Sequence, residues 1–265
     1  MDELDKGMFR LGYYSRIVAR TTNPTELSIR NNAARRWLLD IPREEVVCLD
    51  VETTGLDPHG NDEILQVALC DGNCKMLLDS FVHPKRRRKW SDAQAIHGIS
   101  PAMVANAPTI SELSAPIGRI IAECTLLIGY NVRTFDLEFL KEAGIELPPF
   151  FYVYDLMHDC SVLYGRWNNH YGNYTFISLE KMAAHFHIDY DAHDSGEDAI
   201  ATTKLFYKLL NSQKMRNTIK RLEEQGSAKV SETPKTQKTN ENERINPMLF
   251  VVIVLFVFLI WLASL

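Results

Sequence analysis

The stretch Val46–Leu56, which reads VVCLDVETTGL, decides the fold of this chain. Its apolar start runs into Asp50 and Glu52, and Gly55 then turns the chain. An apolar, β-branched run that ends at a glycine predicts a buried strand over 46–51. Side chains two positions apart on a strand share a face, so the two carboxylates point the same way beside a buried core. Carboxylates held that close repel each other unless a proton or a cation lies between them.

The segments after this strand predict an α/β fold with a mixed five-stranded sheet. Two apolar runs, 63–70 and 74–82, are joined by Asp71-Gly72-Asn73, which is a hairpin signal. Short strands are then expected at 126–129 and 151–154, and a polar, aromatic loop at 165–175. Helices are expected over 110–123, 133–143, 155–164, 178–185 and 194–210. This alternation of helix and strand predicts helices on both faces of the sheet.

Composition limits what the protein binds. The formal net charge of -5 does not suggest a general polyanion binder, so any nucleic-acid contact must come from a local patch. Five consecutive bases, 85–89, form one such patch, and they are either a solvated loop or a phosphate contact. The five cysteines lack the paired spacing of a zinc site and fit buried thiols in a reducing compartment.

The two ends of the chain differ from its centre. Residues 1–45 are expected to form a helical extension, and 213–247 a polar tether. Residues 248–265 carry no charge and would span roughly 27 Å as a helix. We expect a single C-terminal transmembrane anchor, with the domain of residues 46–212 in the cytoplasm. A buried core helix or a partner-binding helix is the alternative interpretation.

Two further carboxylates lie in patterned surroundings. Asp136 ends the pattern N-x-x-x-F-D, which begins at Asn131, and Asp198 ends the pattern H-x-x-x-x-D, which begins at His193. Together with D-x-E-T-T-G at residue 50 and I-H-G-I around His97, this order resembles the DEDDh, or DnaQ-like, 3′–5′ exonuclease family. The resemblance covers roughly residues 46–210 and implies a ribonuclease H-like fold.

The resemblance also implies the roles of individual residues. The ligands of two divalent metals, Mg²⁺ or Mn²⁺, would be Asp50, Glu52, Asp136 and Asp198. His193 would be the general base, with Glu52 beside it in catalysis. The residues expected to hold the substrate are Thr53, Gly55, Leu56, His97 and Asn131. Ser195 departs from the family pattern, since a small apolar residue often stands there, and Asp155 is expected to cap a helix rather than to bind metal.

These residue types suit phosphodiester hydrolysis. Two cations stabilise charge on the attacking and leaving oxygens, and carboxylates are ligands that Mg²⁺ prefers. An imidazole with a pKa of about 6.5 can accept a proton near neutral pH. We therefore expect a metal-dependent 3′–5′ exonuclease acting on a single-stranded 3′ end. A ribonuclease that trims short RNA, or a membrane-bound nucleic-acid-binding module that does not cut, are the alternatives.

Overall fold

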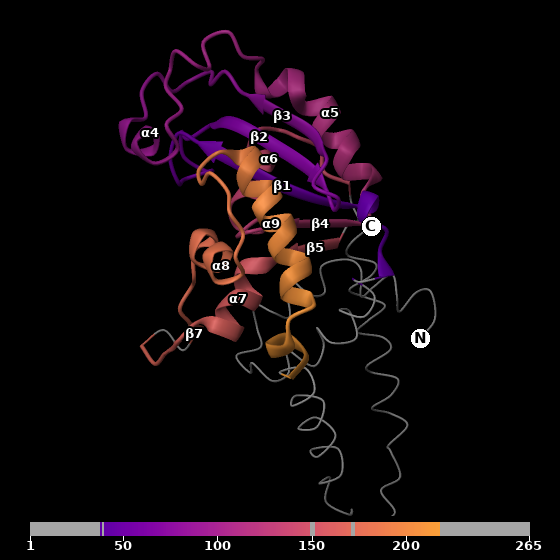
Figure 1. Cartoon of the computed structure of the whole chain (residues 1–265). Coiled ribbons are helices and arrows are strands. Elements are labelled where there is room, and N and C mark those ends of the chain that lie inside the picture. Colours follow the sequence, from indigo (N-terminus) through magenta and orange to yellow (C-terminus); the bar gives the residue numbers. More distant parts are fainter. Residues whose placement is uncertain (1–37, 39, 149–151, 171–172, 218–265) are drawn as a thin grey trace, which may run out of the picture. The chain divides into compact units, whose positions relative to one another are not determined.

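The computed structural model describes residues 38, 40–148, 152–170 and 173–217 (Figure 1). The predicted N-terminal extension lies almost entirely outside these residues, as do most of the predicted tether and the whole of the apolar segment 248–265. Within the part that is described, no helix has the length and apolar character that a membrane crossing requires.

The described residues form a mixed sheet with the strand order β3-β2-β1-β4-β5. β2 runs antiparallel to both β1 and β3, whereas β4 runs parallel to both β1 and β5. This confirms the predicted hairpin and the predicted mixed sheet. The strands are β1 (Val46–Thr53), β2 (Ile64–Asp71), β3 (Met76–Phe81), β4 (Leu126–Gly129) and β5 (Tyr152–Asp155).

Helices and two short strands complete the described fold. A short 3₁₀ turn, η1 (Arg43–Glu45), leads into β1. The helices are α4 (Ser91–His97), α5 (Ile110–Glu123), α6 (Asp136–Glu142), α7 (Leu156–Tyr164), α8 (Leu179–His185) and α9 (Ser195–Leu210). A small ribbon of β6 (Trp167–Asn168) and β7 (Asn173–Tyr174) follows α7.

The strand β1 divides two apolar cores by the alternation of its side chains. Val46 and Cys48 belong to a core shared with α7, α8 and α9, whereas Val47, Leu49 and Val51 belong to a core shared with α5 and α6. A period of two along a strand sends alternate residues to opposite faces. The sheet is therefore covered on both faces, and β1 lies at its centre.

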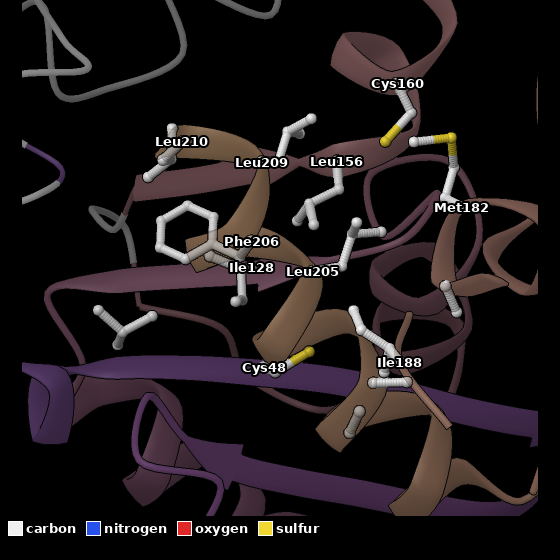
Figure 2. Packing of buried hydrophobic residues seen from close by; sticks show 14 of the residues in the cluster. Cys48, Ile128, Leu156, Cys160, Met182, Ile188, Leu205, Phe206, Leu209 and Leu210 are labelled. Atoms are coloured by element: carbon white, nitrogen blue, oxygen red, sulfur yellow. The ribbon is translucent and has the colours of Figure 1, made fainter. Parts of the chain in front are cut away.

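The core beneath α9 fixes the position of that helix. Figure 2 shows Leu205, Phe206 and Leu209 of α9 close to Ile128 of β4 and Leu156 of α7. All five side chains are fully buried, and burial of each stabilises the fold by about 1.5–3 kcal/mol. The helix α9 also contacts β1 and β2, so its first turn, which carries Asp198, is held close to these strands.

Three features differ from the sequence prediction by more than a shift of one or two residues at the end of an element. The helix expected from residue 133 begins at Asp136, because Asn131 adopts a left-handed backbone conformation and residues 131–135 form a turn. The segment 165–175, expected to be a loop, contains the ribbon of β6 and β7. Met215, placed by the sequence at the start of the tether, is buried in the core beneath α9.

Candidate active site

Asp50 and Glu52 continue the row of β1 side chains that faces α9. They follow Val46 and Cys48 on the same face, so the apolar row becomes acidic at the carboxyl end of the strand. On β2 the residue opposite Asp50 is Ala68, and the residue opposite Glu52 is Gln66. The strand therefore presents two carboxylates to one side, as its sequence predicts.

Asp136 reaches the same place from the first residue of α6. Pairing between β1 and β4 stops at Cys48 and Ile128, so the β1 backbone beyond that point has no β4 partner. The Asp136 carboxylate fills this gap, because its Oδ1 accepts a hydrogen bond of 2.9 Å from the Val51 backbone N–H. A side chain at Gly129 would lie 2.9 Å from the Leu49 carbonyl oxygen, so only glycine allows this close approach.

Asp198 enters the site from the first turn of α9. Its Oδ2 accepts a hydrogen bond of 3.1 Å from the backbone N–H of His193. His193 has a left-handed backbone with φ of 72°, which turns the chain back toward Asp198 before the helix starts. The His193 side chain is 43% exposed, and its Nε2 lies 3.4 Å from Oε1 of Glu180 on α8. The imidazole therefore sits at the rim of the site.

Three of these residues form a compact set of ligand atoms. One ligand atom each from Glu52, His193 and Asp198 lie within 4.8 Å of one another. Asp50 and Asp136 adjoin this set. Asp50 shares the β1 face of Glu52 two residues earlier, and Asp136 accepts a hydrogen bond from the N–H of Val51, which lies between them. The four predicted carboxylates therefore converge at the carboxyl end of β1.

Burial and mutual repulsion both disfavour ionisation of this cluster. Burial raises the pKa of Glu52 to about 8, with further increases from Asp198 and Asp136. Burial is also the main cause that raises the pKa of Asp136 to about 8, against the hydrogen bond from Val51. Burial raises the pKa of Asp198 to about 6, opposed by the bond from the His193 backbone N–H. Burial raises the pKa of Asp50 well above its usual range.

The donor set fits divalent cations. Among the described residues, no lysine or arginine forms an ion pair with Asp50, Glu52, Asp136 or Asp198. Buried carboxylates without a basic partner are stabilised by protons or by cations. Oxygen ligands are those that Mg²⁺ prefers, so the four carboxylates are suited to hold it.

The N-terminal end of α9 carries residues that the sequence analysis did not single out. Asp194 caps the helix, accepting hydrogen bonds from the Gly196 and Glu197 backbone N–H groups. Its other oxygen accepts a bond of 3.1 Å from Nε2 of Gln66, which ties the helix start to β2. The signal for this cap was present, since Asp before a helical run is a strong N-cap.

Two hydroxyl groups face the carboxylates. The Ser195 hydroxyl is fully buried beside Asp50, and it lowers the pKa of that carboxyl, which burial raises well above its usual range. The buried Tyr190 hydroxyl has the same effect on Asp198, whose pKa burial also raises. Ser195 was noted as a departure from the family pattern, but nothing in the sequence places its hydroxyl beside Asp50.

His97 and Thr53 are joined to each other. The His97 Nδ1 accepts a hydrogen bond from the Ile99 backbone N–H, so the ring carries its proton on Nε2 and donates it to the Thr53 carbonyl, at 3.1 Å. Burial lowers the pKa of His97, which favours this neutral form. His97 therefore fastens the end of α4 to the end of β1, and both of its ring nitrogens are engaged there.

The turn after β1 presents an apolar side chain. The Thr53 hydroxyl donates a hydrogen bond of 2.6 Å to the Gly55 carbonyl oxygen, which shapes the turn. A Cβ at Gly55 would lie 2.3 Å from Oδ2 of Asp62, so a larger residue there would displace the Asp62 carboxylate. Leu56 is 84% exposed, which leaves its side chain free to contact a substrate.

Asn131 and Asp155 have structural roles in the described site. The Asn131 side-chain oxygen accepts a hydrogen bond from the Thr134 hydroxyl, and its backbone N–H donates to Asp155. Asp155 also accepts from the Met157 N–H and so caps α7, as predicted. Asn131 thus shapes the turn that delivers Asp136, and its assignment to substrate binding stays a prediction.

Known proteins are similar to this chain in sequence. An exonuclease family profile matches residues 47–206. The DNA polymerase III subunit epsilon-like protein of Rhodobacter capsulatus is 33% identical over 180 residues, which cover 64% of this chain and 24% of that protein. An uncharacterised exonuclease of Escherichia phage 186 is 30% identical over 160 residues, covering 57% of this chain and 78% of that protein.

Solved structures share the fold. E. coli exonuclease I in complex with a dT13 oligonucleotide aligns with a TM-score of 0.53 at 20% identity, over 65% of this chain and 42% of that one. This similarity confirms the α/β architecture with its mixed sheet. On the family match, the carboxylate order and the observed geometry, the chain belongs to the exonuclease family, as a DEDDh-type member of the ribonuclease H-like superfamily.

Proposed function

We propose that residues 46–212 hydrolyse DNA from its 3′ end and release nucleoside 5′-monophosphates one at a time. The observation that carries the proposal is the convergence of Asp50, Glu52, Asp136 and Asp198, with His193 at the rim. The family match supports exonuclease chemistry, and the name of the Rhodobacter relative, a DNA polymerase III subunit epsilon-like protein, supports DNA as the substrate. This chain spans 24% of that relative's length, so substrate and partners belong to the proposal.

The proposed reaction divides the work between the carboxylates and His193. The four carboxylates would hold divalent cations, which when bound stabilise charge on the attacking and leaving oxygens. His193 would accept the proton that a water molecule loses as it attacks the phosphorus atom. Its side chain is 43% exposed at the rim of the site, where it can reach such a water.

The turn after β1 would hold the 3′-terminal nucleotide. The exposed Leu56 side chain offers an apolar surface to a base or sugar. His97 supports this turn by its bond to the Thr53 carbonyl rather than by a free ring nitrogen. We expect substitution of His97 to displace the turn, even where the imidazole itself does not contact the strand.

The decisive experiment is digestion of a 5′-labelled, single-stranded DNA oligonucleotide of about 20 nucleotides with Mg²⁺. A ladder that shortens from the 3′ end supports the proposal, and chelation of the metal should stop the digestion. Asp198→Asn and His193→Ala should each abolish the ladder, while Asp189→Asn serves as the matched control, because Asp189 is an exposed carboxylate in the segment before α9. Wild-type digestion by both site variants would refute the assignment.

The alternatives are separated by the same assay. A matched RNA oligonucleotide digested much faster than DNA would favour an RNA-trimming enzyme, which would need a contact to the 2′-hydroxyl. Tight oligonucleotide binding without metal-dependent turnover would favour a binding module.

We also propose that residues 248–265 anchor the protein in a membrane, with the catalytic domain in the cytoplasm. The support is compositional: these 18 residues, MLFVVIVLFVFLIWLASL, carry no charge. Deletion of the residues after Pro247 should release the protein from the membrane pellet without loss of nuclease activity. A full-length protein that stays in the soluble fraction without detergent would contradict the anchor.

A further inference from the structure

The basic loop, Lys85–Lys89, lies at the same edge of the sheet as the carboxylates. It follows β3 and leads into α4, whose last residue, His97, donates to the Thr53 carbonyl at the end of β1. The side chains of all five basic residues are exposed. Five positive charges are therefore displayed beside an otherwise acidic site in a chain whose net charge is -5.

Glu63 holds the backbone of this loop in place. Its two carboxylate oxygens accept hydrogen bonds from three consecutive backbone N–H groups, those of Lys85, Arg86 and Arg87, at 2.9, 2.8 and 2.7 Å. The Glu63 side chain is only 13% exposed, and its charge makes each of these bonds stronger than a bond to a neutral acceptor. A solvated loop needs no such anchor, and the anchoring indicates a loop with a fixed conformation.

Asp62 connects the basic loop to the turn that follows β1. Its Oδ1 accepts bonds from the Thr54 hydroxyl, at 3.1 Å, and from Nη2 of Arg87, at 2.8 Å. Its Oδ2 accepts a bond of 3.1 Å from the Asp57 backbone N–H. One carboxylate thus spans the loop and the turn proposed to hold the 3′-terminal nucleotide, which sets the distance between them.

Within the described part of the chain, some of the loop's charge remains unpaired. Arg87 pairs with Asp62, and Lys85 donates to the Ser111 hydroxyl. Arg88 and Lys89 have no ion-pair partner among the described residues. Arg86 Nε lies 3.8 Å from Oε1 of Glu63, which is a long ion pair, and the Arg86 side chain is 59% exposed. Its guanidinium therefore also remains accessible to an anion.

We propose that the basic loop binds backbone phosphates of the same nucleic-acid strand whose 3′ end occupies the active site. The proposal rests on the proposed function, and it adds a second contact region for nucleotides upstream of the terminal one. Phosphate contacts position a strand without reading its sequence, and they make binding depend on salt. The loop would therefore favour long strands over the shortest ones.

The test is a charge reversal with a matched control. The double variant Arg88→Glu/Lys89→Glu removes the unpaired charges, and Lys75→Glu/Arg119→Glu changes the net charge by the same amount elsewhere. Lys75 lies in the turn between β2 and β3, and Arg119 lies near the end of α5, which leads into the start of β4. Both control residues are exposed and remote from the carboxyl end of β1.

The first readout is binding of a fluorescent single-stranded DNA oligonucleotide of about 20 nucleotides, measured by anisotropy without catalysis. The loop variant should weaken binding about tenfold, and the slope of log K against log[salt] should fall by about 1.4, which corresponds to two lost contacts. The control variant should change the affinity by less than about twofold and should leave the salt slope unchanged. Equal effects in both variants, or no effect in the loop variant, would overturn the proposal.

The second readout separates this proposal from the proposed function. A chromogenic p-nitrophenyl ester of thymidine 5′-monophosphate reports on the catalytic centre without any upstream phosphate. The loop variant should hydrolyse it at the wild-type rate while its KM for the oligonucleotide rises about tenfold. A loop variant that loses ester hydrolysis would show that the loop supports the active site itself and would refute the proposal. A wild-type protein that hydrolyses neither substrate would refute the nuclease function, and the binding assay would still decide the role of the loop.

Discussion

The two faces of β1 carry different tasks, although their side chains alternate along one strand. Toward α5 and α6 the strand presents Val47, Leu49 and Val51, which are buried among apolar neighbours. Toward α9 it presents Cys48 and then Asp50 and Glu52. The face toward α5 and α6 is apolar along the whole strand and stabilises the fold, whereas the face toward α9 is apolar at its start and acidic at its carboxyl end. The difference shows how a central strand can hold four mutually repelling carboxylates, because the opposite face supplies the stability that they reduce.

The largest expected effect comes from changing the acidic face. Asp50→Asn removes one ligand and should lower nuclease activity by at least about a thousandfold. The free energy of unfolding of the metal-free protein should stay the same or increase, because a neutral amide replaces a carboxyl whose ionisation is disfavoured by burial and by its acidic neighbours. Activity assays and urea denaturation on the same preparation test both halves. Retention of a tenth of the activity would contradict the role of Asp50.

The neighbouring residue tests the apolar face. Leu49→Ala should lower the free energy of unfolding by about 2–5 kcal/mol, because it opens a cavity among fully buried side chains. Its activity, measured at a temperature where the protein is folded, should stay within about twofold of wild type. If the variant does not fold, Ile121→Val on the same side provides a milder change of about 0.5–1.5 kcal/mol. Loss of activity in a folded variant would show that the two faces are coupled.

The pH dependence of the metal-free protein sharpens the comparison. Folding raises the pKa of Glu52 and of Asp136 to about 8 and that of Asp198 to about 6. The folded state then binds more protons than the unfolded chain, whose carboxylates titrate near pH 4, so stability should fall as pH rises from about 4 to 8. Thermal denaturation in chelator should show Tm decreasing over this range. Mg²⁺ should raise Tm more at pH 8 than at pH 5, and an equal rise at both would contradict the carboxylate site.

The smallest effect concerns a hydroxyl group on the acidic side. Ser195→Ala should raise the Mg²⁺ concentration needed for half-maximal activity by about threefold, since Asp50 loses a neighbouring donor but keeps its position on the strand. Thr203→Val is the matched control, because the buried Thr203 hydroxyl contacts Cys70 Sγ at 3.3 Å rather than a carboxylate. The control should change stability without changing the Mg²⁺ requirement. Equal Mg²⁺ requirements in wild type and Ser195→Ala would exclude this role for the hydroxyl.

Much of this division was readable in the sequence. The apolar run that ends before Gly55 predicted the strand, which extends two residues further than expected. The period of two along a strand predicted the shared side of Asp50 and Glu52. The helix 110–123 and the strand 126–129 have the predicted bounds, because a clear period and flanking turn residues marked them. The order of the motifs identified Asp136 and Asp198 as further members of the site. Their separation from Asp50 along the chain does not by itself indicate that they lie close to it.

Other features depend on contacts that no local pattern encodes. The start of α6 was placed too early, because apolar spacing continues through the turn that Asn131 begins in a left-handed conformation. The ribbon of β6 and β7 was missed, because its polar residues lack the alternation of a half-buried strand. The positions of Ser195 and Tyr190 beside carboxylates follow from how α9 packs on the sheet. The predicted anchor at 248–265 lies outside the described residues.

The unequal lengths of β1 and β4 have a consequence for how such a protein can change. Because β4 stops at Gly129, the Val51 N–H is left for Asp136 to bind. An insertion that prolonged β4 by one more pair of residues would let the neighbouring backbone take that donor and expel the carboxylate. Activity could thus be erased in a descendant that retains every acidic residue, so an inventory of motif residues alone would misjudge it, whereas the spacing between Gly129 and Asp136 would reveal the loss.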